Sequence, residues 1–424
     1  MTIIDKALKH IWYPGARMED YQDFKPQQIK RAYGSYIELK NGRKIIDAIS
    51  SWWCKSLGHA HPRLKQAMIK QMNKFEHVMQ PHMIHETIAE LSEKLAHLTK
   101  TLSKVFYASD GSTAVEIAIK MALHAQKNLG RVKRNKFIAL SNGYHGETIG
   151  TLSVSDLGKY TTPYQDLMFK SKFIDNIPYV LTTADPLWED CSKNWQQIEI
   201  FLDSQADNLA AIILEPIVQG SGGMLIYSKD FLKRLSNWTK KHQIYLIADE
   251  IMTGIGRTGK MLACNYAEIE PDFLCLSKGL TSGILPLSVM MTSDEIYDIF
   301  YKKDPFLHSN THYGNALAAS VALEVLKIFE EEKIYEEFDK LNMLTNLQEI
   351  ADETGRIKNV RGIGAIAAAD LVDVDGFKLY KKAMELGAIL RPIGKTIYWL
   401  PPLNISAQTL KELKAITKEA LLVA

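Results

Sequence analysis

Cysteine is scarce in this sequence, and its spacing indicates no thiol chemistry. The 424 residues include four cysteines: Cys54, Cys191, Cys264 and Cys275. No two of them form the C-x-x-C pair of zinc and dithiol sites, so we expect reduced, mostly buried thiols. The histidine pairs His59/His61 and His82/His85 lack the carboxylate or thiol cluster that would complete a metal site. The sequence therefore predicts no metal.

Long apolar runs and an excess of one charge are also missing. No run approaches the roughly 18 apolar residues that a membrane-spanning helix needs, and Met1 to Gly15 contain no apolar stretch of a signal peptide. Lys and Arg number 51 against 49 Asp and Glu, which gives no reason to expect nucleic acid or an anionic membrane as a partner. We expect a cytoplasmic globular protein with room for one large domain and a smaller one.

The most informative segment is Ile244–Gly279. It begins with an apolar run that ends on Asp249, and it closes with a second run, Phe273–Leu276, that leads to Lys278. Short β-rich runs bounded by turn residues predict buried strands of a parallel sheet. Because parallel strands bring their carboxyl ends to the same sheet edge, Asp249 and Lys278 are expected in one pocket.

An amine and a carboxylate at neighbouring strand ends suit pyridoxal phosphate (PLP). This cofactor needs a lysine for its Schiff base and a carboxylate that keeps its pyridine nitrogen protonated. Buried strands also end on charges that only cap a neighbouring helix. Asp249 and Lys278 alone leave both interpretations open.

The glycines of the same segment imitate two nucleotide-binding motifs. Gly254–Gly259 matches G-x-G-x-x-G, but Asp249–Thr253 separates it from the strand that it would have to follow directly. Gly254–Lys260 matches the start of a P-loop and then fails, because Met261 cannot bind magnesium where Ser or Thr is required. We interpret the glycines as a flexible loop with Arg257 at its tip.

Two other strand ends add candidate cofactor contacts. The strand Val105–Tyr107 is followed by a glycine turn, and Ser112 opens a helix rich in small residues, which is typical of an anion site at a helix N-terminus. Helix N-caps of this kind are also common without a ligand. Tyr144 lies on a glycine-flanked loop after the strand Phe137–Leu140, a position suited to stacking on a planar cofactor.

The order of the elements predicts an α/β protein. Strands and helices alternate from about residue 100 to 290, which indicates a large domain with a mostly parallel, helix-covered sheet. A smaller α+β domain is expected from both termini, with a hairpin at Asn41-Gly42 and a long linking helix at about 316–331. The expected ranges are 56–315 for the large domain, and 1–55 with 316–424 for the small one.

Aromatic and basic residues near the chain ends are candidates for a pocket wall. Trp52 and Trp53 fit either the core or the wall of a site for a flat or long-chain substrate. Arg391 ends an expected strand, Ala388–Leu390, and a hairpin would bring Tyr398 close to it. Its guanidinium suits a substrate carboxylate or a neighbouring acidic side chain, and both interpretations stay open.

Seven motifs occur in the order found in one enzyme class. They are Gly58–Pro62, Ser109–Ser112, Tyr144–Gly146, Glu215-Pro216, Asp249-Glu250, Gly256–Gly259 and Ser277–Gly279. The chain resembles the class III (ω-type) aminotransferases, PLP enzymes of fold type I, and the likeness covers nearly its whole length. This resemblance implies PLP as the cofactor and a homodimer with shared active sites.

The resemblance implies a role for each matching residue. Lys278 is expected to bind PLP covalently and move the substrate proton, Asp249 to pair with the pyridine nitrogen, and Tyr144 to stack on the ring. The other implied cofactor contacts are Gly111, Ser112, Glu215, Asn310 and Thr311, the last from the partner subunit. The implied substrate contacts are Trp52, Trp53, Tyr144, Lys278, Ser309, Arg391 and Tyr398.

Within the class, the chain is most similar to the biotin-pathway members, which convert 7-keto-8-aminopelargonate to 7,8-diaminopelargonate. His10–Pro14, Trp52-Trp53 and Arg391–Tyr398 carry this closer likeness. The implied amino donor is S-adenosylmethionine. Gly15, however, stands where these enzymes carry an aromatic residue that helps to hold this donor, which leaves the donor open.

Two further departures and two alternatives accompany the resemblance. Glu147 replaces the usual Asp, and Ser309-Asn310 replaces Gly-Pro. One alternative is another ω-aminotransferase, acting on ornithine, γ-aminobutyrate or a diamine, against which the tryptophan pair and Arg391 argue. The other is a PLP-binding regulator without catalysis, for which we find no basic N-terminal winged-helix region.

Overall fold

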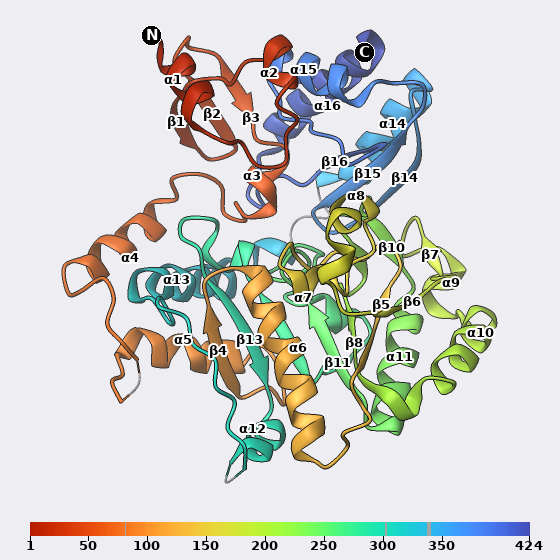
Figure 1. The fold of residues 1–424 in the computed structure, drawn as a ribbon. Helices are drawn as coiled ribbons and strands as arrows, with labels where there is room; N and C mark the ends of the chain where they lie inside the picture. The colour runs from red at the N-terminus through yellow and green to blue at the C-terminus, as the bar shows by residue number, and fades with distance from the viewer. Residues whose placement is uncertain (81, 302, 337–340) are drawn as a thin grey trace.

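The protein has two parts that differ in size. The computed structural model describes residues 1–80, 82–301, 303–336 and 341–424. Figure 1 shows a large body around a central sheet and a smaller part, drawn at the top, in which the red N-terminal and blue C-terminal segments lie together. The predicted domain boundaries near 55 and 315 stay a prediction.

A seven-stranded sheet organises the large body. Its strand order is β4 (Lys104–Ala108), β13 (Ser288–Thr292), β12 (Phe273–Leu276), β11 (Tyr245–Asp249), β8 (Leu209–Leu214), β5 (Lys136–Leu140) and β6 (Lys172–Ile174). Only β13 runs antiparallel to its neighbours, while the pairs from β12 to β6 are parallel. The predicted mostly parallel sheet is therefore confirmed.

Each face of this sheet packs against its own hydrophobic core. All six residues of β8 are buried, and Ile212 and Ile213 point into different cores. The core with Ile213 lies under α6 (Gly111–Asn128), which crosses the front of the sheet in Figure 1. Burial on both faces explains why these strands read as continuous apolar runs. The other core continues into the smaller part of the molecule, and the longer helices of the large body that contribute to it are α4 (Pro62–Met72), α5 (Glu86–Ala96), α10 (Ser192–Asp203), α11 (Lys229–His242) and α13 (Ala316–Glu332).

The smaller part combines segments from both ends of the chain. Its N-terminal sheet is β1 (Ile29–Tyr33), β2 (Tyr36–Leu39) and β3 (Lys44–Ile46), and its C-terminal elements are β14 (Ile357–Ile363), β15 (Ile366–Leu371), β16 (Thr396–Trp399), α14 (Met343–Thr354), α15 (Gly376–Leu386) and α16 (Ala407–Val423). The hairpin between β2 and β3 turns at Gly42, with φ +87°, as predicted. Backbone bonds from Ile46 N to Gly387 O (2.8 Å) and from Ile389 N to Ile46 O (2.9 Å) join the two segments.

The predicted strand that ends on Arg391 is wrong. Ala388 forms one isolated bridge with Ile46, and residues 389–392 belong to no strand. Pro392 has no N–H to donate, so a ladder cannot continue through it. A bridge between Ile393 and Thr396 then returns the chain into β16.

The remaining elements are short. They are α1 (Ile3–His10), α2 (Asp20–Asp23), α3 (Ser50–Trp53), α7 (Ile149–Leu152), α8 (Gly158–Thr161), α9 (Pro186–Glu189), α12 (Asp294–Phe300), β7 (Tyr179–Val180), β9 (Val218–Gln219), β10 (Leu225–Tyr227) and the 3-10 turns η1 (Thr162–Leu167), η2 (Ala206–Asn208), η3 (Ala263–Tyr266), η4 (Lys278–Thr281) and η5 (Ile334–Glu336). Strands β7, β10 and β9 form a small antiparallel sheet.

Candidate active site

The carboxyl ends of β11 and β12 bring a carboxylate and an amine together. Asp249 is the last residue of β11, and Lys278 opens η4 directly after β12. The two strands pair in parallel, with Asp249 opposite Cys275. The common pocket that the sequence predicted for Asp249 and Lys278 is consistent with this register, because both residues follow the same sheet edge.

Lys278 is held in an unusual environment. Its backbone is left-handed, with φ +39°, and its Nζ lies 4.9 Å from the centre of the Trp53 ring. Burial lowers the pKa of this amine, although the carboxylates of Asp249 and Glu215 oppose the shift. A larger share of neutral amine makes Lys278 a better nucleophile and proton acceptor.

Asp249 is fixed by a histidine that the sequence reasoning left without a role. His145 Nδ1 donates to Asp249 Oδ2 at 2.8 Å, and Ile251 N donates to Oδ1 at 3.1 Å. His145 is itself buried, and its backbone N–H donates to Ser155 Oγ at 2.9 Å. The two hydrogen bonds to Asp249 therefore fix the orientation of its carboxylate.

Tyr144 and Glu215 are linked through the backbone. Tyr144 N donates to one oxygen of Glu215 at 3.1 Å, and Gly220 N donates to the other at 2.9 Å. Burial raises the pKa of Glu215 to about 7 and also raises the pKa of Tyr144, whose hydroxyl donates to Glu147 at 3.1 Å. The longer Glu147, which departs from the family pattern, therefore still reaches this hydroxyl.

Helix α6 begins where the sequence predicted an anion site. Asp110 is the N-cap of this helix, and its side chain accepts from Thr113 N at 3.0 Å. The first two residues of the helix are Gly111 and Ser112. A side chain at Gly111 would press on Ile251, and one at Gly146 would collide with Ser112. The two glycines thus keep a cradle open beside free backbone N–H groups, where a phosphate binds well. Amine, carboxylate and anion cradle together fit PLP.

The two tryptophans separate in the structure. Trp53 is 6% exposed and donates from Nε1 to the hydroxyl of buried Tyr398 at 3.1 Å. Trp52 is 52% exposed, and the Arg391 guanidinium lies 4.8 Å from its ring centre. One tryptophan of the pair thus lies in the core and the other at the pocket wall. Arg391 also donates to Gly15 O.

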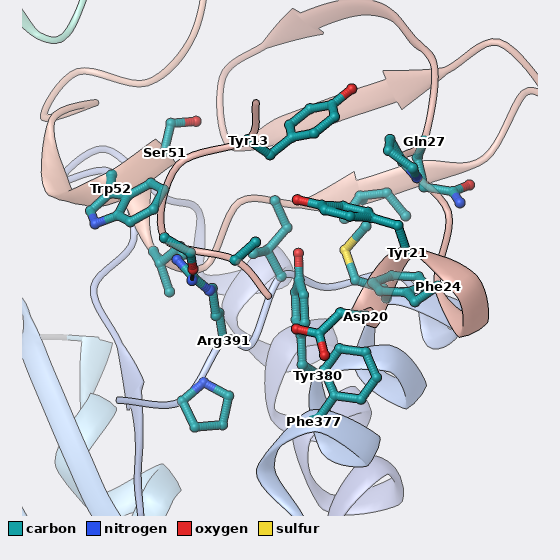
Figure 2. Close-up of a pocket in the computed structure, with 18 of the residues that line it drawn as sticks. Tyr13, Asp20, Tyr21, Phe24, Gln27, Ser51, Trp52, Phe377, Tyr380 and Arg391 are labelled. Atoms are coloured by element: carbon teal, nitrogen blue, oxygen red, sulfur yellow. Dashed lines mark hydrogen bonds between the residues drawn. The ribbon is translucent and has the colours of Figure 1, made fainter. Parts of the chain in front are cut away.

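Trp52 and Arg391 line a cavity of about 810 Å³ between the N-terminal segment and α15. Figure 2 shows these two side chains on one side of the cavity and the rings of Tyr21, Tyr380 and Phe377 across from them. Trp53 and Tyr398 are not among the residues that line it. Of the seven predicted substrate contacts, Trp52 and Arg391 line this cavity, whereas Trp53, Tyr144, Lys278, Ser309 and Tyr398 do not.

The segment Ser309–Thr311 lies apart from these residues. Ser309 and Thr311 are exposed, and Thr311 O accepts from His77 Nε2 at 2.9 Å. Among the described residues, no hydrogen bond joins this segment to Ser112 or Lys278, and Asn310 Nδ2 is buried without a partner. Its role in a partner subunit's site stays a prediction.

Arg257 is not at the tip of a flexible loop, so that interpretation is wrong. Its side chain is 3% exposed and donates to Pro401 O at 2.7 Å. Burial lowers the pKa of this guanidinium to about 9. The glycines of this segment allow close packing, because Gly364 lies against the backbone of Thr258.

The described part of the chain contains neither a metal-binding cluster nor a membrane-spanning helix. No group of three or more His, Cys, Asp or Glu in residues 1–80, 82–301, 303–336 and 341–424 is arranged to hold a metal ion. No helix within these ranges is long and apolar enough to cross a membrane.

Comparisons with known proteins point to one family. A family model described as Aminotransferase class-III matches residues 18–421. The adenosylmethionine-8-amino-7-oxononanoate aminotransferase of Helicobacter pylori is 38% identical over 420 residues, which cover 96% of this chain and 94% of that protein. The enzyme of the same name from Aquifex aeolicus is 37% identical over 417 residues, which cover 94% and 92%.

Solved structures agree with the sequence matches. The adenosylmethionine-8-amino-7-oxononanoate aminotransferase of Methanocaldococcus jannaschii superimposes with a TM-score of 0.92 at 32% identity, over 100% of this chain and 99% of that one. An amine transaminase from an uncultivated Pseudomonas species, solved in its PLP-bound form, gives 0.89 at 28% identity over 98% of both chains. This chain therefore belongs to the class III aminotransferases and is a PLP-dependent transaminase of fold type I.

Proposed function

We propose that the enzyme transfers an amino group to 7-keto-8-aminopelargonate and forms 7,8-diaminopelargonate, a step of biotin synthesis. The observation that carries this proposal is that the Arg391 guanidinium borders the cavity without an acidic partner in the described part of the chain. Among the described residues, no carboxylate forms an ion pair with its guanidinium, which borders the cavity against Trp52. A fork of N–H donors beside an apolar cavity suits a carboxylate at the end of a long apolar substrate. The names of the two curated relatives support the same acceptor.

The chain's residues would hold PLP at three points. Gly111 and Ser112 would present N–H groups to the phosphate, Asp249 would face the pyridine nitrogen, and the ring of Tyr144 would stack on the cofactor. When bound, PLP supplies an electron-withdrawing ring that stabilises negative charge on the substrate carbon next to nitrogen. The hydrogen bond from His145 would hold the Asp249 carboxylate in place.

Lys278 has two tasks in this scheme. Its amine holds the cofactor in the resting enzyme, and once displaced it takes the proton from the donor carbon and returns one to the acceptor carbon. The lowered pKa of the amine favours the neutral form that can accept a proton near neutral pH. The ring of Trp53 packs against this amine, with its centre 4.9 Å from Nζ.

We propose S-adenosylmethionine as the amino donor. Gly15 offers no ring for the adenosine group, and its carbonyl accepts from Arg391. The rings of Tyr13 and Tyr21, 5.0 Å apart in the same cavity, are available for stacking instead. Adding single amines to the PLP enzyme and following its absorbance tests the donor directly. S-Adenosylmethionine should convert the spectrum, and conversion only by another amine would overturn this assignment.

We also propose a cytoplasmic homodimer in which Thr311 serves the partner's site. Exposed apolar side chains occur on α4, on the loop after it and on the segment after α12. They are Ile69, Met72, Met79, Met83, Ile84 and Leu307. A second copy covering them would remove this apolar surface from water and bring the hydroxyl of Thr311 to a phosphate.

Arg391→Ala tests the acceptor. Loss of a partly buried charge pair costs about 2–4 kcal/mol, so the KM for 7-keto-8-aminopelargonate should rise roughly 30- to 1000-fold. Arg17→Ala is a matched control, because Arg17 lines the same cavity but is already paired with Asp20 at 2.9 Å. Wild-type enzyme should use the methyl ester of the acceptor almost as poorly as the variant uses the acid. Equal rates with acid and ester would refute the proposed acceptor.

A further inference from the structure

Four consecutive residues without glycine, Ser50–Trp53, have left-handed backbones. Their φ values are +50°, +45°, +72° and +72°, a region that L-residues avoid because Cβ crowds the carbonyl. Trp53 N donates to Ile49 O at 2.8 Å and Cys54 N to Ser50 O at 2.9 Å, which closes a left-handed turn. Such a run persists only where surrounding contacts impose it.

The carboxylate of Asp47 imposes this turn. Asp47 is fully buried, its Oδ1 accepts from Ser51 N at 2.8 Å and its Oδ2 accepts from Ser51 Oγ at 2.6 Å. Ser50 Oγ donates to Leu400 O at 2.7 Å and ties the turn to the end of β16. Asp47 thus binds both polar groups of the one residue at the centre of the left-handed run.

His59 in turn fixes Asp47. Its Nε2 donates to Asp47 Oδ2 at 2.8 Å. Its backbone is anchored by a reciprocal pair of hydrogen bonds with Gly34, of 2.8 and 3.0 Å. Among the described residues, no lysine or arginine forms an ion pair with Asp47, so the imidazole is the group that compensates this buried carboxylate.

The turn decides where two site residues point. Trp52 faces outward under Arg391 at the cavity, while Trp53 faces inward against Lys278 and Tyr398. A right-handed turn with the same sequence would rotate the two indoles in the opposite sense about the chain. The handedness of Ser50–Trp53 therefore sets the geometry of the guanidinium that receives the acceptor.

We propose that Asp47 and His59 are positioning residues for acceptor binding, acting through the left-handed turn on Trp52 and Arg391. This inference rests on the proposed acceptor. It predicts a selective effect: acceptor affinity depends on the pair, whereas attachment of the cofactor to Lys278 and reaction with the amino donor depend on it much less.

The test compares His59→Leu with His59→Gln, because a glutamine amide N–H can replace the imidazole Nε2–H and leucine cannot. His59→Leu should raise the acceptor KM at least about tenfold, the size of one lost hydrogen bond to a charged group, and His59→Gln should stay within about threefold of wild type. The rate of the donor half-reaction should change by less than about threefold in both variants.

A readout that does not depend on turnover accompanies the kinetics. Nonanoate, an unreactive acid of the acceptor's chain length, should bind wild type and His59→Gln with similar dissociation constants by calorimetry, and His59→Leu at least about tenfold more weakly. His61→Leu is the control, because His61 lies two residues away and its ring environment is Arg63, Glu324 and Glu332. His61→Leu should leave the acceptor KM and the dissociation constant of nonanoate unchanged.

The outcomes separate the two proposals. If wild type does not use 7-keto-8-aminopelargonate, the proposed function fails, and nonanoate binding still tests the turn. If His59→Leu does not fold, Ser51→Ala removes the hydroxyl that binds Asp47 and should show the same selective rise in acceptor KM. Equal losses in donor and acceptor half-reactions, or a lowered melting temperature with unchanged acceptor KM and nonanoate binding, would overturn the positioning role.

Discussion

Burial sets the proton affinity of the side chains around Lys278. It lowers the pKa of the lysine, raises that of Glu215 to about 7 and raises that of Tyr144, because each charged form loses its hydration. Asp249 differs from Glu215 in its direct bond from a histidine, at 2.8 Å. Two buried carboxylates a short distance apart along the sheet edge are thus given different tasks by their partners alone.

Glu215 makes folding depend on pH. Its carboxyl releases a proton near pH 4.5 in the unfolded chain and near 7 in the folded one. Between these values the folded state binds more protons, so stability falls as pH rises from 4.5 to 7 and is level above that. Urea unfolding of the cofactor-free protein should show a slope approaching about 1.4 kcal/mol per pH unit, which Glu215→Gln should lack. Parallel profiles for the two proteins would contradict the raised pKa.

Asp249→Asn should slow the donor half-reaction at least about tenfold, because an amide cannot supply the charge-assisted hydrogen bond to the pyridine nitrogen, worth roughly 1.5–3 kcal/mol. Stopped-flow absorbance after adding the donor measures this rate. Asp272→Asn makes the same chemical change before β12, at the opposite end of the strands, where the carboxylate accepts from Leu246 N at 2.7 Å. That variant should react normally, and a normal rate in Asp249→Asn would remove the assigned role.

At the scale of elements, local sequence patterns predicted the strands and turns correctly, but they did not predict contacts between segments far apart in the chain. The parallel strands, the hairpin at Gly42 and the start of α6 follow from apolar runs and turn residues close together in sequence. Arg257 was misplaced because its burial depends on Pro401, far along the chain. The separation of Trp52 from Trp53 depends on a left-handed turn that no local propensity favours.

The start of α6 gives a prediction in which two effects compete. Gly111→Ala should stabilise a helix by up to about 1 kcal/mol through propensity. The new Cβ would, however, lie 2.9 Å from Ile251 Cδ1 and intrude on the phosphate cradle. We expect PLP to bind about tenfold more weakly, by fluorescence titration of cofactor-free enzyme. Gly158→Ala, where the nearest atom is 3.9 Å away, is the control; unchanged PLP affinity in Gly111→Ala would exclude the cradle.

At the scale of the whole molecule, the proposed dimer makes each active site composite. Lys278→Ala and Thr311→Val subunits should each be inactive or nearly so as homodimers. A mixed dimer formed by subunit exchange has one site of two with both wild-type groups, so purified mixed dimers should show about half of the wild-type activity. The unseparated equal mixture, in which half the dimers are mixed, should show about a quarter. Tagged subunits purified as a mixed pair measure this. Pure heterodimers without activity would show that Thr311 serves its own subunit.

The cavity also has a consequence for the order of events during synthesis. Its walls come from residues 13–52 and 376–394, so more than three hundred residues separate the two sides. The large body, with Asp249 and Lys278, precedes the segment that carries Arg391 and can fold domain by domain as the chain leaves the ribosome. A growing chain therefore acquires Asp249 and Lys278 before it acquires the second wall of the cavity to which we assign acceptor binding.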